Sequence, residues 1–330
     1  MTWKKWTHIV AALLLVTLPA VMVARAGRGQ NPKQTTADKP DKQPPSTLKI
    51  DVDLVLVTTT VTDSLGRYVS GLESSHFQIW EDKVEQKIEY FSAEDVPVSV
   101  GVIFDVSGSM KDKISTAREA ASTFWKSGNP EDEYFLEVFA NRPELASDFT
   151  TDITKLQSKL IMMPAKGMTA MYDSVYLGLE KLKEATNPKK ALLLITDGED
   201  NRSRYTFQNV KEFVKEQDVQ IYGIGIVDEW NSQLSAGRTG RAMVEELADL
   251  TGGGAFFPNS VFELEDICTK IAVELKNQYV IGYHSTNEAK DGKWRKLRLK
   301  VNPPKGIQRL NVRSKQGYYA ATADAAPGKN

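Results

Sequence analysis

Three oxygen-bearing side chains stand at alternate positions where an apolar run ends. The run extends from Val98 to Phe104 and is followed by Asp105, Ser107 and Ser109. This spacing, at the point where a buried strand stops, lets one carboxylate and two hydroxyls converge on a single point. Hard oxygen donors of this kind suit Mg²⁺, Mn²⁺ or Ca²⁺ rather than zinc or copper. Because the motif has one carboxylate, a metal site here needs further ligands from elsewhere in the chain.

Two later segments offer those ligands. Thr169 lies in a loop that runs into a helical pattern, and Asp197 follows a second apolar run, Ala191 to Ile195. The carboxyl ends of neighbouring strands meet at one edge of a parallel sheet, which is where such folds bind ligands. We therefore predict a divalent-metal site, with Mg²⁺ as the expected ion and Mn²⁺ or Ca²⁺ as alternatives, formed by Asp105, Ser107, Ser109, Thr169 and Asp197.

The order of these pieces resembles the metal-ion-dependent adhesion site of von Willebrand factor type A domains. The pieces are Asp-x-Ser-x-Ser at 105–109, then a threonine at 169, then Thr-Asp-Gly at 196–198. The resemblance spans roughly residues 97–276. It implies that the three hydroxyls bind the metal and that the two aspartates act directly or through waters. From Leu48 to Tyr319 the chain also looks like a bacterial group of exported proteins related to this family, on turns such as 63–67 and 250–253.

The central part of the chain alternates between strand and helix patterns. Strands are predicted at 98–104, 134–139, 191–196, 219–226 and 254–257, and helices at about 112–127, 152–161, 171–185, 206–216, 240–250 and 261–276. Such alternation gives a mainly parallel sheet covered by helices on both faces. The predicted fold class is therefore a doubly wound, Rossmann-like α/β domain over residues 97–276.

Two β-rich segments, 48–96 and 277–320, flank this domain. Each has short strand patterns and turns without a helix, and each is small for an independent core. We expect them to combine into one small all-β, sandwich-like region into which the α/β domain is inserted. The alternative is two separate β elements packed on the α/β domain.

The two ends of the chain have their own composition. Lys4 and Lys5 precede an apolar run that ends near a small-x-small site at 24–26, which predicts a signal peptide over residues 1–26. An uncleaved membrane anchor is the alternative. Residues 27–47 are predicted to be a disordered linker and residues 321–330 a disordered tail. The signal peptide predicts export, to a bacterial envelope or periplasm or by secretion. With Cys268 as the single cysteine no intrachain disulfide can form, which fits a bacterial envelope better than a eukaryotic extracellular module.

The function expected from this site is metal-dependent protein binding. A divalent ion with few anionic ligands favours an incoming carboxylate, so the expected partner is a protein that presents an Asp or Glu. The formal net charge of −1 argues against a nucleic-acid partner. Membrane contact is expected only if the N-terminal segment stays attached. The candidate rim residues around the metal are Met110, Met168, Met171, Arg202, Arg204, Tyr205 and Trp230.

Other interpretations of the same residues stay open. A strand-ending aspartate can cap the next helix instead of binding metal, and Asp173 favours such a cap. Glu199 and Asp200 are either metal-tuning groups or solvated loop charges. The chain could also be a scaffold subunit in which the metal only stabilises loops. An enzyme is not expected, because the histidines, His8, His76 and His284, lie far in sequence from the metal motif.

Overall fold

The computed structural model describes residues 54–197, 200–226, 235–304, 306 and 309–322. The predicted signal peptide, the predicted linker and residues 323–330 of the predicted tail lie outside this range, as do Glu199 and Trp230. Within the described residues, none of the helices combines the length and the apolar character that a membrane span requires.

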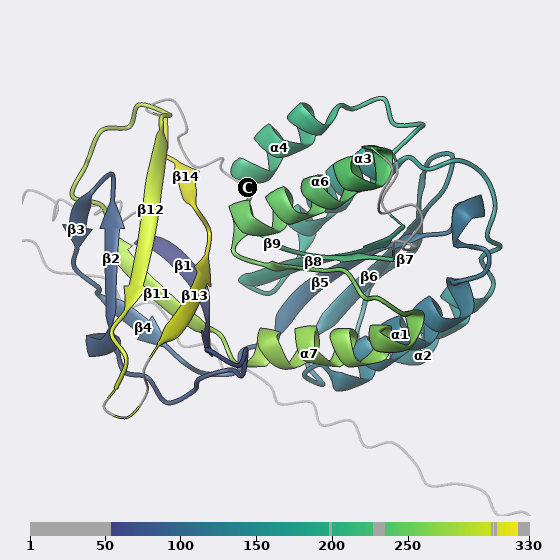
Figure 1. The fold of residues 1–330 in the computed structure, drawn as a ribbon. Coiled ribbons are helices and arrows are strands. Elements are labelled where there is room, and N and C mark those ends of the chain that lie inside the picture. The colour runs from purple at the N-terminus through teal and green to yellow at the C-terminus, as the bar shows by residue number, and fades with distance from the viewer. Residues whose placement is uncertain (1–53, 198–199, 227–234, 305, 307–308, 323–330) are drawn as a thin grey trace, which may run out of the picture. The chain divides into compact units, whose positions relative to one another are not determined.

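The centre of the chain folds around a six-stranded sheet (Figure 1). Its strand order is β10-β9-β8-β5-β6-β7, and all neighbours are parallel except β6 and β7, which are antiparallel. The strands are β5 (Val98–Asp105), β6 (Glu133–Phe139), β7 (Pro143–Thr150), β8 (Lys189–Thr196), β9 (Gln220–Gly225) and β10 (Gly254–Phe256). The mainly parallel sheet confirms the predicted fold class.

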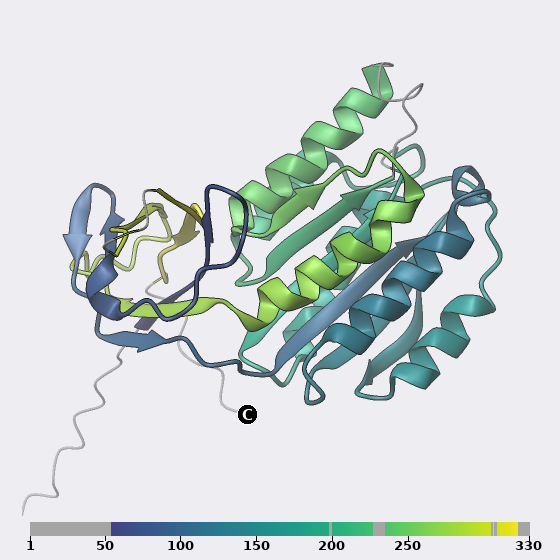
Figure 2. The ribbon, with the colours of Figure 1, turned by 60° about the horizontal axis from the view of Figure 1, so that its bottom comes forward.

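Helices cover both faces of this sheet. One face carries α1 (Ile114–Ser127), α2 (Ile153–Ile161) and α7 (Leu264–Lys276), which Figure 2 shows lying across it. The other face carries α3 (Met171–Lys181), α4 (Phe207–Lys215) and α6 (Ser235–Thr251). Because both faces are covered, every residue of β5 and β9 is buried. Cys268 packs in the first of these two cores and is fully buried.

Strand β7 is the element of this sheet that the sequence did not reveal. Its residues, Pro-Glu-Leu-Ala-Ser-Asp-Phe-Thr, alternate only weakly, and Ser147 is its one buried residue. An edge strand contacts the sheet on one side, so it needs few apolar side chains and leaves little pattern to detect. Smaller differences concern helix starts: α1 begins after a 3₁₀ turn, η2 (Gly108–Met110), and α7 begins after η4 (Val261–Glu263).

The two flanking segments together form two four-stranded antiparallel sheets. One sheet has the order β13-β1-β11-β4 and the other the order β14-β12-β2-β3. Each sheet takes two strands from each segment, namely β1 (Leu54–Asp63), β2 (Phe77–Glu81), β3 (Val84–Gln86), β4 (Tyr90–Ser92), β11 (Tyr279–His284), β12 (Trp294–Val301), β13 (Leu310–Ser314) and β14 (Gly317–Tyr319). Neither segment can therefore complete a sheet alone. A short 3₁₀ turn, η1 (Ser74–His76), precedes β2.

The α/β domain and the β sheets are joined through one buried carboxylate. Glu274, near the end of α7, is 1% exposed, and both of its oxygens lie 2.6 Å from Nη2 of Arg313 on β13. The hydroxyls of Thr60 on β1 and Tyr222 on β9 donate to Oε1, each at 2.9 Å. The Tyr68 hydroxyl donates to Oε2 at 3.1 Å. One side chain thus connects a helix and a strand of the α/β domain to two strands of a β sheet.

Close backbone contact supports the same junction. Gly252 follows α6 with a φ of 76°, and a Cβ built there would come within 2.4 Å of the carbonyl carbon of Ser314 on β13. Gly253 N donates to the carbonyl of Ala248, and Gln316 N donates to the carbonyl of Leu250. The turn at 250–253 therefore needs glycine both for its conformation and for the approach of β13.

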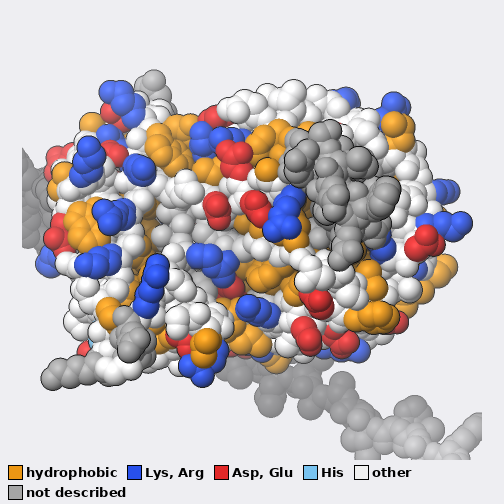
Figure 3. All heavy atoms as spheres, viewed as in Figure 1, with side chains coloured by type: hydrophobic (Ala, Val, Ile, Leu, Met, Phe, Trp, Pro, Cys, Tyr) orange, Lys and Arg blue, Asp and Glu red, His pale blue; other side chains and the backbone are white. Residues whose placement is uncertain are grey.

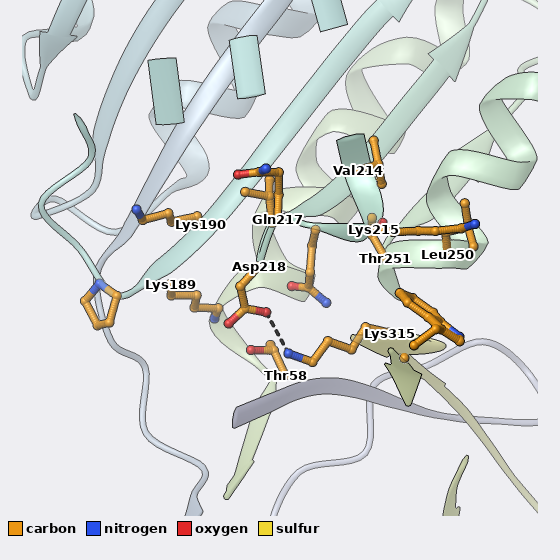
Figure 4. Close-up of a pocket in the computed structure, with 15 residues that line it drawn as sticks. Thr58, Lys189, Lys190, Val214, Lys215, Gln217, Asp218, Leu250, Thr251 and Lys315 are labelled. Carbon is orange, nitrogen blue, oxygen red and sulfur yellow. Dashed lines mark hydrogen bonds and ion pairs between the residues drawn. The ribbon is translucent and has the colours of Figure 1, made fainter. Parts of the chain in front are cut away.

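A small hollow lies beside this junction (Figure 4). Lysines 189, 190, 215 and 315 line it, and Lys315 forms an ion pair with Asp218 at 2.9 Å. The Lys189 ammonium is buried and donates to the carbonyl of Leu275. With a volume of about 30 Å³, the hollow has room for water but not for an organic ligand.

We predict that Glu274→Gln lowers the free energy of unfolding by about 3 kcal/mol, because the half-buried Arg313 guanidinium would lose its counter-charge at the buried end of the pair. Urea denaturation followed by circular dichroism measures the loss. Asp266→Asn, at an exposed position of the same helix, is the matched control and should change stability by less than about 0.5 kcal/mol. Equal stability of the two variants would contradict the structural role assigned to Glu274.

Candidate functional site

The proposed site begins at Asp105, the last residue of β5, whose side chain is fully buried. Its Oδ1 accepts a hydrogen bond from the backbone N–H of Ser107 at 2.8 Å. Its Oδ2 accepts one from the hydroxyl of Thr196, the last residue of β8, also at 2.8 Å. The carboxylate is therefore fixed between the ends of two adjacent parallel strands.

Ser107 and Ser109 lie in the loop that follows Asp105, and their side chains meet. The hydroxyl oxygens of Ser107 and Ser109 lie 3.0 Å apart. Ser107 is 1% exposed, whereas Ser109 is exposed to solvent. Convergence of the triplet, which the alternate spacing predicted, is thus present, and one of its hydroxyls faces outward.

The loop that carries Thr169 lies against the serine loop. Gly108 N donates to the carbonyl of Gly167 at 3.0 Å, and Lys166 N donates to the carbonyl of Val106 at 2.8 Å. Thr169 itself is 3% exposed. These backbone contacts place Thr169 in the segment that runs beside Ser107 and Ser109.

Asp197 completes the set at the end of β8. Its side chain is 8% exposed, and Lys113 Nζ lies 3.9 Å from its Oδ2. The same ammonium donates to the carbonyl of Ile226 at 3.4 Å. Burial, and second the negative charge of Asp197, raise the pKa of Asp105 to about 6. The two aspartates are thus close enough to repel one another.

The donor set fits a hard divalent cation. A buried Asp105 carboxylate beside the negative charge of Asp197 favours a nearby positive charge, and the accompanying hydroxyls are oxygen donors of the kind that Mg²⁺ and Ca²⁺ accept. Within the described ranges, no group of three or more His, Cys, Asp or Glu side chains gathers as a metal cluster would. A metal here would therefore depend on the serine and threonine hydroxyls as well as on the two aspartates.

A second loop, residues 200–205, holds the Thr169 segment in place. Asn201 Oδ1 accepts from the N–H of Thr169 at 2.9 Å, and the Thr169 carbonyl accepts from the N–H groups of Asn201 and Arg202. Asp200 Oδ2 accepts from Tyr172 N at 3.0 Å. Asp200 thus satisfies an N-terminal amide of α3.

Asp173, on α3, binds the backbone of the 200–205 loop in return. Its Oδ1 accepts from the backbone N–H groups of Arg204 and Tyr205, at 2.8 and 3.0 Å. It therefore fixes the 200–205 loop instead of capping its own helix, which corrects the capping role that its position favoured. The cap for its own N–H is the Ser203 hydroxyl, at 3.0 Å.

Four further residues position this site. Thr196, Asn201, Ser203 and Lys113 contact the candidate ligands or their loops through the bonds described above. Thr196 belongs to the Thr-Asp-Gly motif that the sequence analysis used, whereas the roles of the other three were missed. The others act across 30 or more residues of sequence, so local spacing could not reveal them.

The candidate rim residues divide into buried and exposed groups. Met110 and Met171 are 0% and 1% exposed and belong to the two cores, so they are packing residues. Met168 is 44% exposed. Tyr205 stacks on Tyr176 with ring centroids 4.1 Å apart. The side chain of Arg204 is 90% exposed and lies 3.6 Å from Asp173.

The described histidines lie among the β sheets. His284 ends β11, and its Nδ1 is 2.8 Å from Glu89. His76 ends η1, where its Nδ1 accepts from Glu73 N. Neither makes a hydrogen bond to the aspartates or serines of the candidate site.

The comparisons with known proteins agree with this fold. The model of the von Willebrand factor type A (VWA) domain family matches residues 100–199, the segment that contains all five candidate ligands. This chain therefore carries a domain of the von Willebrand factor type A family. No curated protein matches the chain.

Several solved structures are similar to parts of this chain at low identity. An aerotolerance-related membrane protein from Bacteroides fragilis has 19% identity and a TM-score of 0.44, with 54% of this chain and 98% of that one covered. The vWF domain of the type V pili tip protein Mfa5 from Porphyromonas gingivalis has 14% identity and a TM-score of 0.43, with coverage of 55% and 97%. A von Willebrand factor type A protein from Catenulispora acidiphila has 12% identity and a TM-score of 0.47, with coverage of 83% and 74%. The family match points to a protein-binding module.

One further carboxyl group lies beneath the Thr169 segment. Glu137 on β6 is 4% exposed, and its Oε1 has no hydrogen-bond partner. It lies in the sheet face that packs on α3, between Phe135 and Phe139, and Ser174 of α3 hydrogen-bonds to it. Burial raises the pKa of this glutamate to about 8, against a smaller lowering by the Ser174 hydrogen bond.

We predict that Glu137→Gln makes the stability of the protein less sensitive to a rise in pH between 4.5 and 8. The folded state holds the Glu137 proton up to about pH 8, whereas the unfolded chain releases it near 4.5. Wild-type stability should therefore fall between these values. The advantage of the variant should grow from near zero at pH 4.5 to at most about 4 kcal/mol at pH 8.

Urea denaturation at a series of pH values measures this difference. Glu144→Gln, at an exposed position of the neighbouring strand β7, should follow the wild-type curve. A constant offset between wild type and Glu137→Gln across the range would show that the carboxyl ionises normally.

Proposed function

We propose that this chain is an exported, metal-dependent protein-binding module of the adhesion type. Its VWA domain would hold Mg²⁺, or Mn²⁺ or Ca²⁺, through Asp105, Ser107, Ser109, Thr169 and Asp197. When bound, the ion would supply an open coordination position that accepts a carboxylate from a partner Asp or Glu. Export rests on the N-terminal pattern at residues 1–26.

The observation that carries this proposal is the pairing of two buried aspartates with an outward-facing hydroxyl. Burial, and second the negative charge of Asp197, raise the pKa of Asp105, so a cation beside it would be favourable. The exposure of Ser109 leaves that position reachable from solvent. On the face shown in Figure 3, basic and acidic side chains are interspersed over the α/β domain. Such a surface favours a protein partner over a nucleic acid.

The contacts between the loops favour binding over a purely structural role for the metal. The Thr169 segment is tied to the serine loop and to residues 200–205 by hydrogen bonds between protein groups. These bonds would contribute to the order of the loops independently of a bound ion. A scaffold subunit with a metal that only rigidifies the loops is the second proposal, and it predicts a large loss of stability on chelation.

Catalysis is not part of the proposal. A serine nucleophile at 107 or 109 would need a general base, and the described histidines lie in the β sheets, hydrogen-bonded to other groups. The partner would be captured without bond breaking.

We predict that calorimetric titration at pH 7.5 detects Mg²⁺ binding. Asp105→Asn should lower the Mg²⁺ affinity by more than about 100-fold, which exceeds the usual effect of removing a group that only contacts a metal ligand. Asp112→Asn, an exposed neighbour in the same loop, should bind like wild type. Below about pH 6 the wild-type affinity should fall by about tenfold per pH unit, because protons compete for Asp105. Unchanged affinity in Asp105→Asn would rule out this site.

Partner capture is tested with residues 48–330 immobilised and exposed to bacterial envelope extract. We expect a band that is present with Mg²⁺ and absent with EDTA or with Asp105→Ala as bait. Thermal melting of the same samples separates the two proposals. A scaffold should lose stability on chelation and keep its partner, whereas a binding module should lose its partner and keep its fold.

A further inference from the structure

Large apolar side chains are exposed on the connection that leads into the metal site. Met162 is 79% exposed, Ile161 is 65% exposed and Met168 is 44% exposed. All three lie between the end of α2 and Thr169. We call these three side chains the apolar shelf. Exposed apolar groups that gather in one place mark interaction sites more often than isolated ones do.

The shelf is held beside the candidate ligands. Arg118 on α1 donates to the carbonyl of Met163, and Met163 N donates to the carbonyl of Leu160. Asn141 Oδ1 accepts from Met168 N at 2.9 Å. Together with the bonds from Lys166 and Gly108 described above, these contacts fix residues 163–168 against α1 and the serine loop. Met168 therefore lies beside the metal edge, and Ile161 and Met162 directly precede the fixed segment.

The surrounding loops carry an excess of positive charge. Among the exposed described residues of 107–112, 141–142, 161–168 and 200–205, the one acidic residue is Asp112, and the basic residues are Lys111, Arg142, Lys166, Arg202 and Arg204. A bound divalent ion would add to this excess. The surface is thus complementary to a segment that is both acidic and apolar.

We propose that the apolar shelf selects the partner: the site binds a protein segment in which an Asp or Glu is flanked by bulky apolar residues. The carboxylate would complete the metal shell, and a neighbouring apolar side chain would pack on Ile161, Met162 and Met168. This inference rests on the proposed metal-dependent function and adds specificity to it, since the metal alone accepts any carboxylate.

Two synthetic peptides test the proposal, Gly-Leu-Asp-Leu-Gly and Gly-Ser-Asp-Ser-Gly, each blocked at both ends and labelled for fluorescence anisotropy in Mg²⁺. Burial of one leucine side chain corresponds to about tenfold or more in affinity. Wild type should bind the leucine peptide at least about tenfold more tightly than the serine peptide.

The variant Ile161→Ser with Met162→Ser should reduce this preference to less than about threefold. Its Mg²⁺ affinity, measured by calorimetry, should stay at the wild-type value. Leu65→Ser is the matched control, because Leu65 is 75% exposed but lies in a turn of the β region. That variant should keep the full preference.

The outcomes separate the two levels of the proposal. Equal affinity for both peptides, or a preference that survives in the shelf variant, overturns the selection by the shelf while leaving metal-dependent binding intact. Mg²⁺ binding without measurable binding of either peptide overturns both the shelf and carboxylate capture. Absence of Mg²⁺ binding refutes the proposed function itself.

Discussion

The buried carboxylate of Glu274 is the constraint on which the rest of the described structure depends. A charge removed from water is stable only with a close counter-charge and satisfied hydrogen bonds, and Glu274 obtains these from Arg313, Thr60, Tyr222 and Tyr68. Its partners come from β13, β1, β9 and the turn after β1. The ion pair can therefore form only when the α/β domain and both flanking segments are folded and docked together.

This dependence explains how the inserted α/β domain can hold a candidate site at the end of its sheet that lies away from the junction. The junction lies where α7 ends and β8 begins, whereas the candidate metal ligands lie where β5 and β8 end. The junction fixes the end of the sheet opposite to the site. The loops at the carboxyl edge are organised by their own contacts. They are tied to one another through Asn201, Asp200 and Asp173. The site is thus preorganised by protein hydrogen bonds on a rigid sheet.

The edge around the site combines two kinds of chemistry. Buried aspartates create a demand for a cation, while Ile161, Met162 and Met168 present apolar surface to water beside them. Either feature alone is common on proteins. Both features lie on connected loops, and it is on this placement that the proposed selectivity of the site rests.

The sequence by itself determined the α/β class, five of the six strands of the sheet and the triplet that converges at Asp105, because burial on both faces and alternate spacing are local patterns. It could not reveal β7, whose single buried residue leaves no periodicity. Tertiary structure alone decided that Asp200 caps α3, that Asp173 holds the opposite loop and that Glu274 meets Arg313. These contacts join residues about 30 to 40 positions apart, and side chains this distant meet only after the strands between them have paired.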